Sequence, residues 1–151
     1  MMTIRSALIL ATFMVAGIGT FGVGLAHSSL MTSSIKDGAT VRVMPKTITL
    51  EFSEAVELGF SRFKLIALDP KIKTLKAANL KADSVLEATL ERLDDEASRA
   101  DDGLLTNAAV AAKLEVKLKA KLPAGWYVMM WKVLSVDTHN SSDYFVFKYR
   151  P

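Results

Sequence analysis

The sequence predicts an all-β protein: an antiparallel β-sandwich with a short helical insertion around residues 83–100. Three observations lead to this prediction. Short segments in which apolar and polar residues alternate recur along most of the chain. Turn-forming residues separate them at intervals of about ten residues, as in sandwiches. The chain has 151 residues and no cysteine. We therefore expect one domain that buries a sufficient core without disulfides.

The first 26 residues have the pattern of a cleaved secretory signal peptide. Arg5 is their only charged residue, and the uncharged run that follows ends in Gly24-Leu25-Ala26. Signal peptidase accepts small residues at the −3 and −1 positions, so we expect cleavage before His27. An uncleaved membrane anchor is the alternative, because about 20 apolar residues can span a bilayer. We expect residues 27–151 to form the mature, exported domain.

Two strands are expected in the first half of this domain. In Thr47–Ser53, apolar residues alternate with polar ones, which places every second side chain on one buried face. Phe60–Leu68 is the second candidate strand. It ends at Asp69-Pro70, because proline lacks a backbone donor and restricts the residue before it.

The middle of the chain changes to a helical period. Ser84 and Glu87 have the spacing of a capping box. Apolar residues then recur at helical intervals, namely Leu86, Leu90, Leu93 and Ala97. We expect Asp101-Asp102-Gly103 to end this helix, and the helix to cover one edge or end of the sandwich.

Three further strands are expected after the helix. Residues 114–119 alternate Leu or Val with Glu or Lys. Trp126–Val136 is a long apolar run, as in a strand that is buried on most sides. Tyr144–Tyr149 gives a last strand near the C-terminus.

Composition excludes several classes of function. The formal net charge is only +3, with no basic stripe that would hold nucleic-acid phosphates. Without cysteine there are no thiolate zinc sites and no cysteine nucleophiles. Ser135, Asp137 and His139 lie too close along one segment to form a hydrolase relay, so no catalytic residues are predicted.

The chain has only two histidines, and the positions of both favour metal binding. A free N-terminal His27 would chelate one ion through its α-amine and its ring Nδ1. If the segment Ser135–His139 is extended, Asp137 and His139 point to the same side. One amine, two imidazoles and one carboxylate in a tetragonal arrangement suit copper(II), whereas zinc prefers tetrahedral sites. The prediction is one copper(II) ion per chain.

Several stretches together resemble one known family. They are Ala26-His27 with Leu30, Ser34 and Asp37–Val41, then Pro45, Leu50–Glu57 and Phe60-Ser61, then Leu122–Tyr127, Trp131–His139 and Phe145–Phe147. The chain resembles the CopC family of bacterial periplasmic copper-binding, or copper-resistance, proteins. The Ser-x-Asp-x-His element is the most specific of these stretches.

This resemblance implies an immunoglobulin-like, Greek-key β-sandwich and a copper(II) site. Carried onto this sequence, the ligands are His27 through amine and ring, Asp137 and His139. The implied protein is a monomeric, non-enzymatic copper carrier in the periplasm that acts in copper resistance or homeostasis. Its implied partner is an inner-membrane copper transporter of the CopD type.

Three departures from the family pattern limit this inference. Some members have a methionine-rich copper(I) site, whereas the corresponding region here offers only Met44, so we expect no such site. Residues 82–112 form a longer and more helical segment than the family has, either a solvated cover or a docking surface. Asp143 follows His139 where the family commonly has proline and glycine, and it either approaches the metal or caps a turn.

Two other functions remain open at this stage. An exported immunoglobulin-like interaction module would use the same sandwich, with incidental histidines and no metal. A copper monooxygenase-like enzyme, similar to lytic polysaccharide monooxygenases, would also chelate copper with an N-terminal histidine. Such enzymes present a flat aromatic surface, whereas only 8% of this chain is aromatic.

Overall fold

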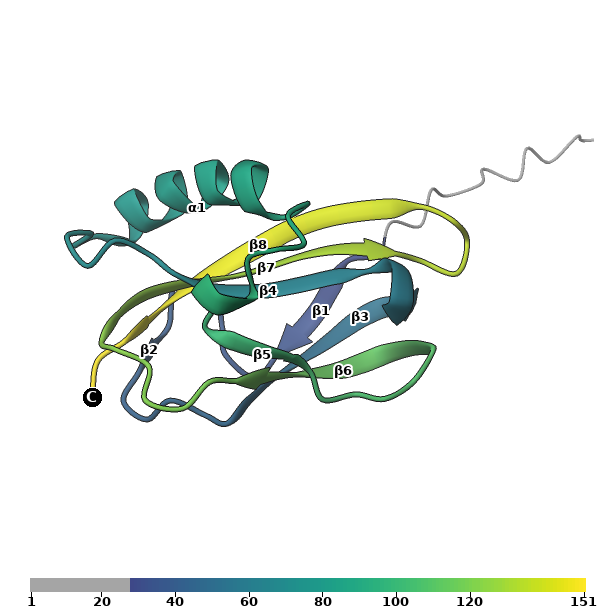
Figure 1. Ribbon diagram of the computed structural model, residues 1–151, viewed down its shortest axis with the longest axis horizontal. Coiled ribbons are helices and arrows are strands. Elements are labelled where there is room, and N and C mark those ends of the chain that lie inside the picture. Colours follow the sequence, from purple (N-terminus) through teal and green to yellow (C-terminus); the bar gives the residue numbers. More distant parts are fainter. Residues whose placement is uncertain (1–27) are drawn as a thin grey trace, which may run out of the picture.

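The computed structural model describes residues 28–151, in which two sheets pack face to face and one helix covers the outside of one sheet (Figure 1). The predicted signal peptide and His27 lie outside the described residues. The predicted sandwich is confirmed. No helix within residues 28–151 is long and apolar enough to cross a membrane.

Each sheet has four strands. In the first sheet the order is β1 (Leu30–Ser33), β3 (Thr47–Glu57), β6 (Val110–Leu118) and β5 (Asp101–Leu104), with every pair antiparallel. In the second sheet the order is β2 (Thr40–Val41), β8 (Asn140–Tyr149), β7 (Gly125–Leu134) and β4 (Arg62–Ala67). Strand β2 pairs parallel with β8 over two residues, which departs from the expected antiparallel pattern.

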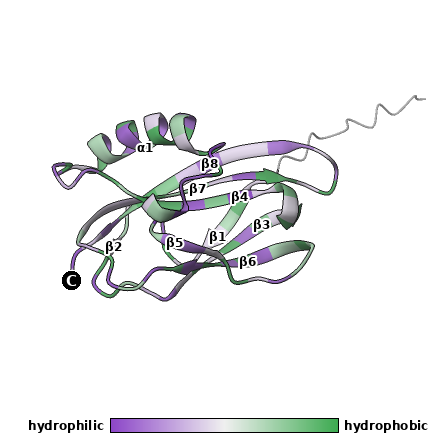
Figure 2. Ribbon diagram, viewed as in Figure 1, coloured by the Kyte–Doolittle hydropathy of each residue, from purple (hydrophilic) through white to green (hydrophobic). Residues whose placement is uncertain are grey.

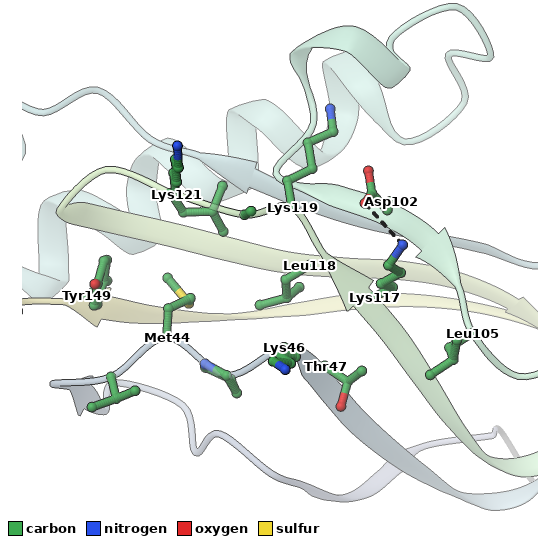
Figure 3. A pocket seen from close by; sticks show the side chains of 14 residues that line it. Met44, Lys46, Thr47, Asp102, Leu105, Lys117, Leu118, Lys119, Lys121 and Tyr149 are labelled. Carbon is green, nitrogen blue, oxygen red and sulfur yellow. Dashed lines mark ion pairs between the residues drawn. The ribbon is translucent and has the colours of Figure 1, made fainter.

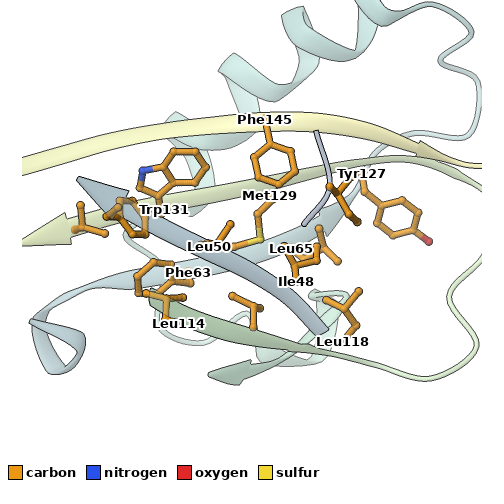
Figure 4. Packing of buried hydrophobic residues seen from close by; sticks show 14 of the residues in the cluster. Ile48, Leu50, Phe63, Leu65, Leu114, Leu118, Tyr127, Met129, Trp131 and Phe145 are labelled. Atoms are coloured by element: carbon orange, nitrogen blue, oxygen red, sulfur yellow. The ribbon is translucent and has the colours of Figure 1, made fainter. Parts of the chain in front are cut away.

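The core lies between the two sheets (Figure 4). Alternation along β3 holds as predicted, because Ile48, Leu50 and Phe52 are all buried on one face. Phe52 packs edge-on against Trp131 of β7, with ring centroids 5.9 Å apart. Such aromatic contacts between the sheets add to the hydrophobic effect of burial.

Strand β7 is buried on both faces, as its apolar run predicted. Tyr127, Met129 and Trp131 belong to the core between the sheets, whereas Val128 and Met130 pack with the helix-side cluster. The helix α1 (Leu75–Thr89) covers this second face through the buried Ala78 and Ala82, and Figure 2 shows that apolar and polar residues both occur along it.

The predicted bounds of the helix are wrong. α1 begins at Leu75, where the Thr74 hydroxyl accepts a hydrogen bond from the Ala77 N–H at 3.2 Å. Ser84, the predicted cap, lies inside the helix. Helical structure ends before Leu93, whose side chain is 70% exposed, and only a short 3-10 turn (Glu96–Ser98) follows.

A buried lysine explains where the helix ends. The Lys64 Nζ of β4 donates to the carbonyls of Thr89 and Arg92, each at 2.6 Å, and to the Asp95 carboxylate at 2.7 Å. Lys64 and Asp95 are only 1% and 3% exposed, so their charges must be satisfied by each other and by these carbonyls. This tertiary contact overrides the local helical period after Leu90.

The prediction that Asp101-Asp102-Gly103 ends a helix is wrong, because these residues form part of β5. The buried Asp101 carboxylate accepts hydrogen bonds from the backbone N–H groups of Leu65 at 2.8 Å and Gly103 at 2.9 Å. It therefore joins β5 to β4, which belong to different sheets. The strand predicted over Phe60–Leu68 starts at Arg62, after a 3-10 turn (Leu58–Phe60).

We expect Asp95→Ala to lower the free energy of unfolding by about 3 kcal/mol, because the buried Lys64 charge would lose its carboxylate partner. Urea denaturation measures this change. Asp94→Ala is the matched control. Asp94 pairs with Arg92, and their side chains are 83% and 55% exposed. We therefore expect Asp94→Ala to lower the free energy of unfolding by less than about 0.5 kcal/mol. Equal losses in the two variants would contradict the role assigned to burial.

Candidate metal centre

The segment that carries Asp137 and His139 is a tight loop between β7 and β8. The Ser135 N–H donates to the His139 carbonyl and the Thr138 N–H donates to the Ser135 carbonyl, both at 2.9 Å. Thr138 has φ 74°, the left-handed conformation that a three-residue hairpin loop requires at its last position. The segment is therefore a turn, and the extended conformation considered for it in the sequence is not adopted.

The loop nevertheless brings the two predicted side chains together. Nδ1 of His139 lies 3.0 Å from Oδ2 of Asp137. Both side chains remain accessible to solvent, at 45% for His139 and 37% for Asp137. Asp137 and His139 therefore lie side by side, through a turn and not through a shared strand face.

Ser135 holds the Asp137–His139 pair in place through hydrogen bonds. Its side chain is fully buried, and its hydroxyl donates to Oδ1 of Asp137 and contacts the His139 carbonyl at 3.1 Å. Oδ1 of Asp137 also accepts from the His139 N–H at 3.2 Å. Sequence reasoning assigned no role to Ser135, although its place two residues before Asp137 is typical of side-chain hydrogen bonds within a turn.

These hydrogen bonds stabilise the charged form of Asp137. The Ser135 hydroxyl, followed by the His139 backbone N–H, lowers the pKa of Asp137 below its ordinary value. Asp137 is therefore an anionic oxygen donor at neutral pH. Its ionised form favours the folded loop above the ordinary aspartate pKa, and this contribution is lost as the pH falls through the lowered value.

The loop is also fixed to the opposite sheet. Ser135 forms an antiparallel bridge with Val56 of β3, and the Val136 N–H donates to the Ala55 carbonyl at 3.3 Å. The position of the Asp137–His139 pair therefore depends on how the two sheets pack.

The start of the described chain lies against the same end of β8. The Ser141 hydroxyl donates to the Ser28 carbonyl at 2.7 Å, and the Ser53 N–H donates to the Ser29 carbonyl at 2.8 Å. Ser28 is only 2% exposed, and its buried hydroxyl has no hydrogen-bond partner within residues 28–151. Residue 28 is thus held next to Ser141, two positions after His139.

Asp143 does not join the pair. It lies in β8 opposite Trp131, and its Oδ1 accepts from the adjacent Tyr144 N–H at 2.8 Å. Across the described part of the chain, no group of three or more histidine, aspartate or glutamate side chains gathers as in a metal site. Residues 28–151 therefore bring together two of the three predicted ligands, and His27 lies outside them.

The observed pair fits two adjacent ligands of one ion. Metal bonds to imidazole nitrogen and carboxylate oxygen are about 2.0–2.2 Å long, so ligands at right angles lie about 3 Å apart. The separation of 3.0 Å between Nδ1 of His139 and Oδ2 of Asp137 agrees with this distance, and it also agrees with the length of a hydrogen bond. An imidazole nitrogen and a carboxylate oxygen are ligands that copper(II), nickel(II) and zinc all accept.

We expect Ser135→Ala to raise the pKa of Asp137 toward the ordinary value of about 3.9, because the strongest donor to its carboxylate is removed. An NMR titration of the Asp137 carboxyl carbon measures it. Ser142→Ala, on an exposed serine of the same hairpin, should leave it unchanged. An unaltered pKa in Ser135→Ala would show that Ser135 does not control this carboxylate.

Comparisons with known proteins identify the family. The family model described as the CopC domain matches residues 30–150. Protein YobA of Escherichia coli strain K12 is 30% identical over 123 residues, which cover 81% of this chain and 77% of YobA. YobA of Shigella flexneri matches to the same extent.

Solved structures agree in fold. CopC from Methylosinus trichosporium OB3b aligns with a TM-score of 0.57 at 22% identity, over 83% of this chain and 95% of that one. PcoC, a methionine-rich copper resistance protein from Escherichia coli, aligns with a TM-score of 0.56 at 23% identity, over 83% and 100%. Because the family model spans all eight strands of the sandwich, this chain belongs to the CopC family.

Proposed function

We propose that this protein is an exported copper(II)-binding protein that carries copper in the periplasm as part of copper resistance or homeostasis. The observation that carries this proposal is the Asp137–His139 pair, an imidazole and an ionised carboxylate 3.0 Å apart on an accessible loop. Membership of the CopC family supports it, as does the description of PcoC as a copper resistance protein.

The proposed ligand set is His27 through its amine and ring, with Asp137 and His139. Cleavage before His27 would create the amine, and residue 27 is covalently joined to Ser28, which lies against Ser141. The three nitrogens bind copper only when they are unprotonated. Copper(II) binding should therefore weaken as the pH falls, because protons compete for these nitrogens.

The solvent accessibility of the Asp137–His139 pair is suitable for a protein that passes its metal ion to a partner. About half of the His139 side chain is exposed, so an incoming ligand from a partner can reach the ion without unfolding the loop. We propose delivery to, or receipt from, an inner-membrane transporter of the CopD type. The charge of the Asp137 carboxylate offsets part of the charge of copper(II), which favours stable binding.

Electron paramagnetic resonance of the protein that begins at His27, with one equivalent of copper(II), tests the ligand set. We expect an axial type 2 spectrum with nitrogen hyperfine structure, lost in His27→Ala and in His139→Ala. Asp137→Asn should weaken copper binding at least ten-fold. The matched control is Asp143→Asn, because Asp143 lies on the same hairpin but apart from the pair.

A spectrum like that of free aquo-copper would contradict the proposal and favour an interaction module without metal. Equal effects of Asp137→Asn and Asp143→Asn would show that general negative charge, not a ligand, is responsible.

Acetylation of the His27 α-amine should weaken copper(II) binding by about a hundred-fold or more. It converts the amine into an amide and leaves no free amine beside the imidazole, which breaks the amine–ring chelate. Competition against a chelator of known affinity measures the loss. Amidation of the C-terminal Pro151 is the control, and equal affinity of both modified forms would exclude the N-terminal chelate.

A further inference from the structure

A groove with a volume of about 700 Å³ lies at the opposite end of the sandwich from the Asp137–His139 loop. Strand β8 links the two sites, since its first residue follows His139 and its last, Tyr149, lines the groove. A ten-residue strand spans roughly 30 Å. The groove is therefore separate from the candidate metal centre.

The floor of the groove is apolar and linear. Figure 3 shows Tyr149, Met44, Leu118 and Leu105 in a row along it. Leu105 is 53% exposed, and the neighbouring Val43 is 81% exposed. Leu118 in the same row is only 6% exposed. Exposed apolar side chains that gather in one groove with a polar rim are typical of an interaction site.

The rim of the groove is positively charged. Four lysines and a single acid line it, and that acid, Asp102, pairs with Lys117 at 3.5 Å. Lys46 and Lys121 form no ion pair with any residue in the described part of the chain. In Figure 3, Lys46 lies on one side of the apolar row and Lys121 on the other, so cations flank the floor on both sides.

The backbone at Lys121 is strained. Its φ is 57°, a left-handed conformation that costs a residue with a side chain about 1–2 kcal/mol. Glycine would adopt this conformation without that cost. The loop instead keeps a lysine at the rim, and strained residues of this kind cluster at functional sites.

We propose that this lysine-rimmed groove binds an extended, acidic segment of a partner protein, in which apolar residues alternate with aspartate or glutamate. In an extended chain, alternate side chains point to opposite sides, with about 6.6–6.8 Å between those on one side. Apolar side chains would lie along the row from Tyr149 to Leu105, and carboxylates would reach the lysines. Charge complementarity with the rim selects the acidic partner.

The open shape favours a peptide over a small molecule. Small-molecule sites bury most of the surface of their ligand, whereas this groove is only about half enclosed. A segment of a partner protein needs only one of its sides buried. The proposal does not depend on copper binding, since neither Asp137 nor His139 lines the groove.

Fluorescence anisotropy with a labelled nine-residue peptide of alternating glutamate and leucine tests this site. We expect this peptide to bind at least ten-fold more tightly than one with lysine in place of glutamate, or one with serine in place of leucine. The double variant Lys46→Glu with Lys121→Glu should weaken binding at least ten-fold. Lys76→Glu with Lys81→Glu, the same charge change on exposed residues of α1, should alter it less than two-fold.

The apolar floor is tested separately. Leu105→Ser should weaken binding about five-fold or more, whereas Leu80→Ser, at a leucine of α1 that is 65% exposed, should not.

Equal loss in both double-lysine variants, or equal binding of the glutamate–serine peptide, would overturn the proposal in favour of non-specific charge attraction. Preferred binding to phosphatidylglycerol vesicles would make the groove a membrane contact. Dimerisation that the Lys46 and Lys121 changes abolish would make a second copy the occupant.

Discussion

Strand β7 has no face exposed to solvent, and the rest of the structure depends on that constraint. Its odd-numbered residues fill the space between the sheets, and Trp126, Val128 and Met130 pack in the cluster that α1 covers. It is hydrogen-bonded to β4 on one side and to β8 on the other. A shift by one residue would exchange its two buried faces, so its register is fixed. The loop that follows it therefore has a fixed starting point.

Alternation and length were sufficient to predict most of the sandwich from the sequence. The clean alternation of Thr47–Ser53 and the long apolar run after Gly125 each gave the correct strand. The helix was misplaced because its C-terminal end is set by Lys64, which is distant in sequence, and not by local period. The residues around Ser84 have the spacing of a capping box, but Thr74 is the residue that caps the helix.

Residue chemistry allowed the Asp137–His139 pair to be predicted, although local geometry did not. No glycine or asparagine marks the left-handed position of the loop, because Thr138 occupies it. The segment therefore resembled a strand. The role of Ser135, which holds the Asp137 carboxylate, could not be predicted from the sequence either. Its burial follows from the bridge to Val56 in the other sheet. The groove at the far end escaped notice because its lining comes from segments far apart in the sequence.

The contact between Ser141 and Ser28 joins positions separated by 113 residues, whereas Ser135, Asp137 and His139 lie within one hairpin. Local contacts form early in folding, and closing a long loop is slow because of its entropic cost. The hairpin can therefore form long before Ser28 reaches Ser141. The contact between Ser28 and Ser141 therefore distinguishes a fully folded chain from a partly folded one, because only the fully folded chain holds Ser28 beside the loop.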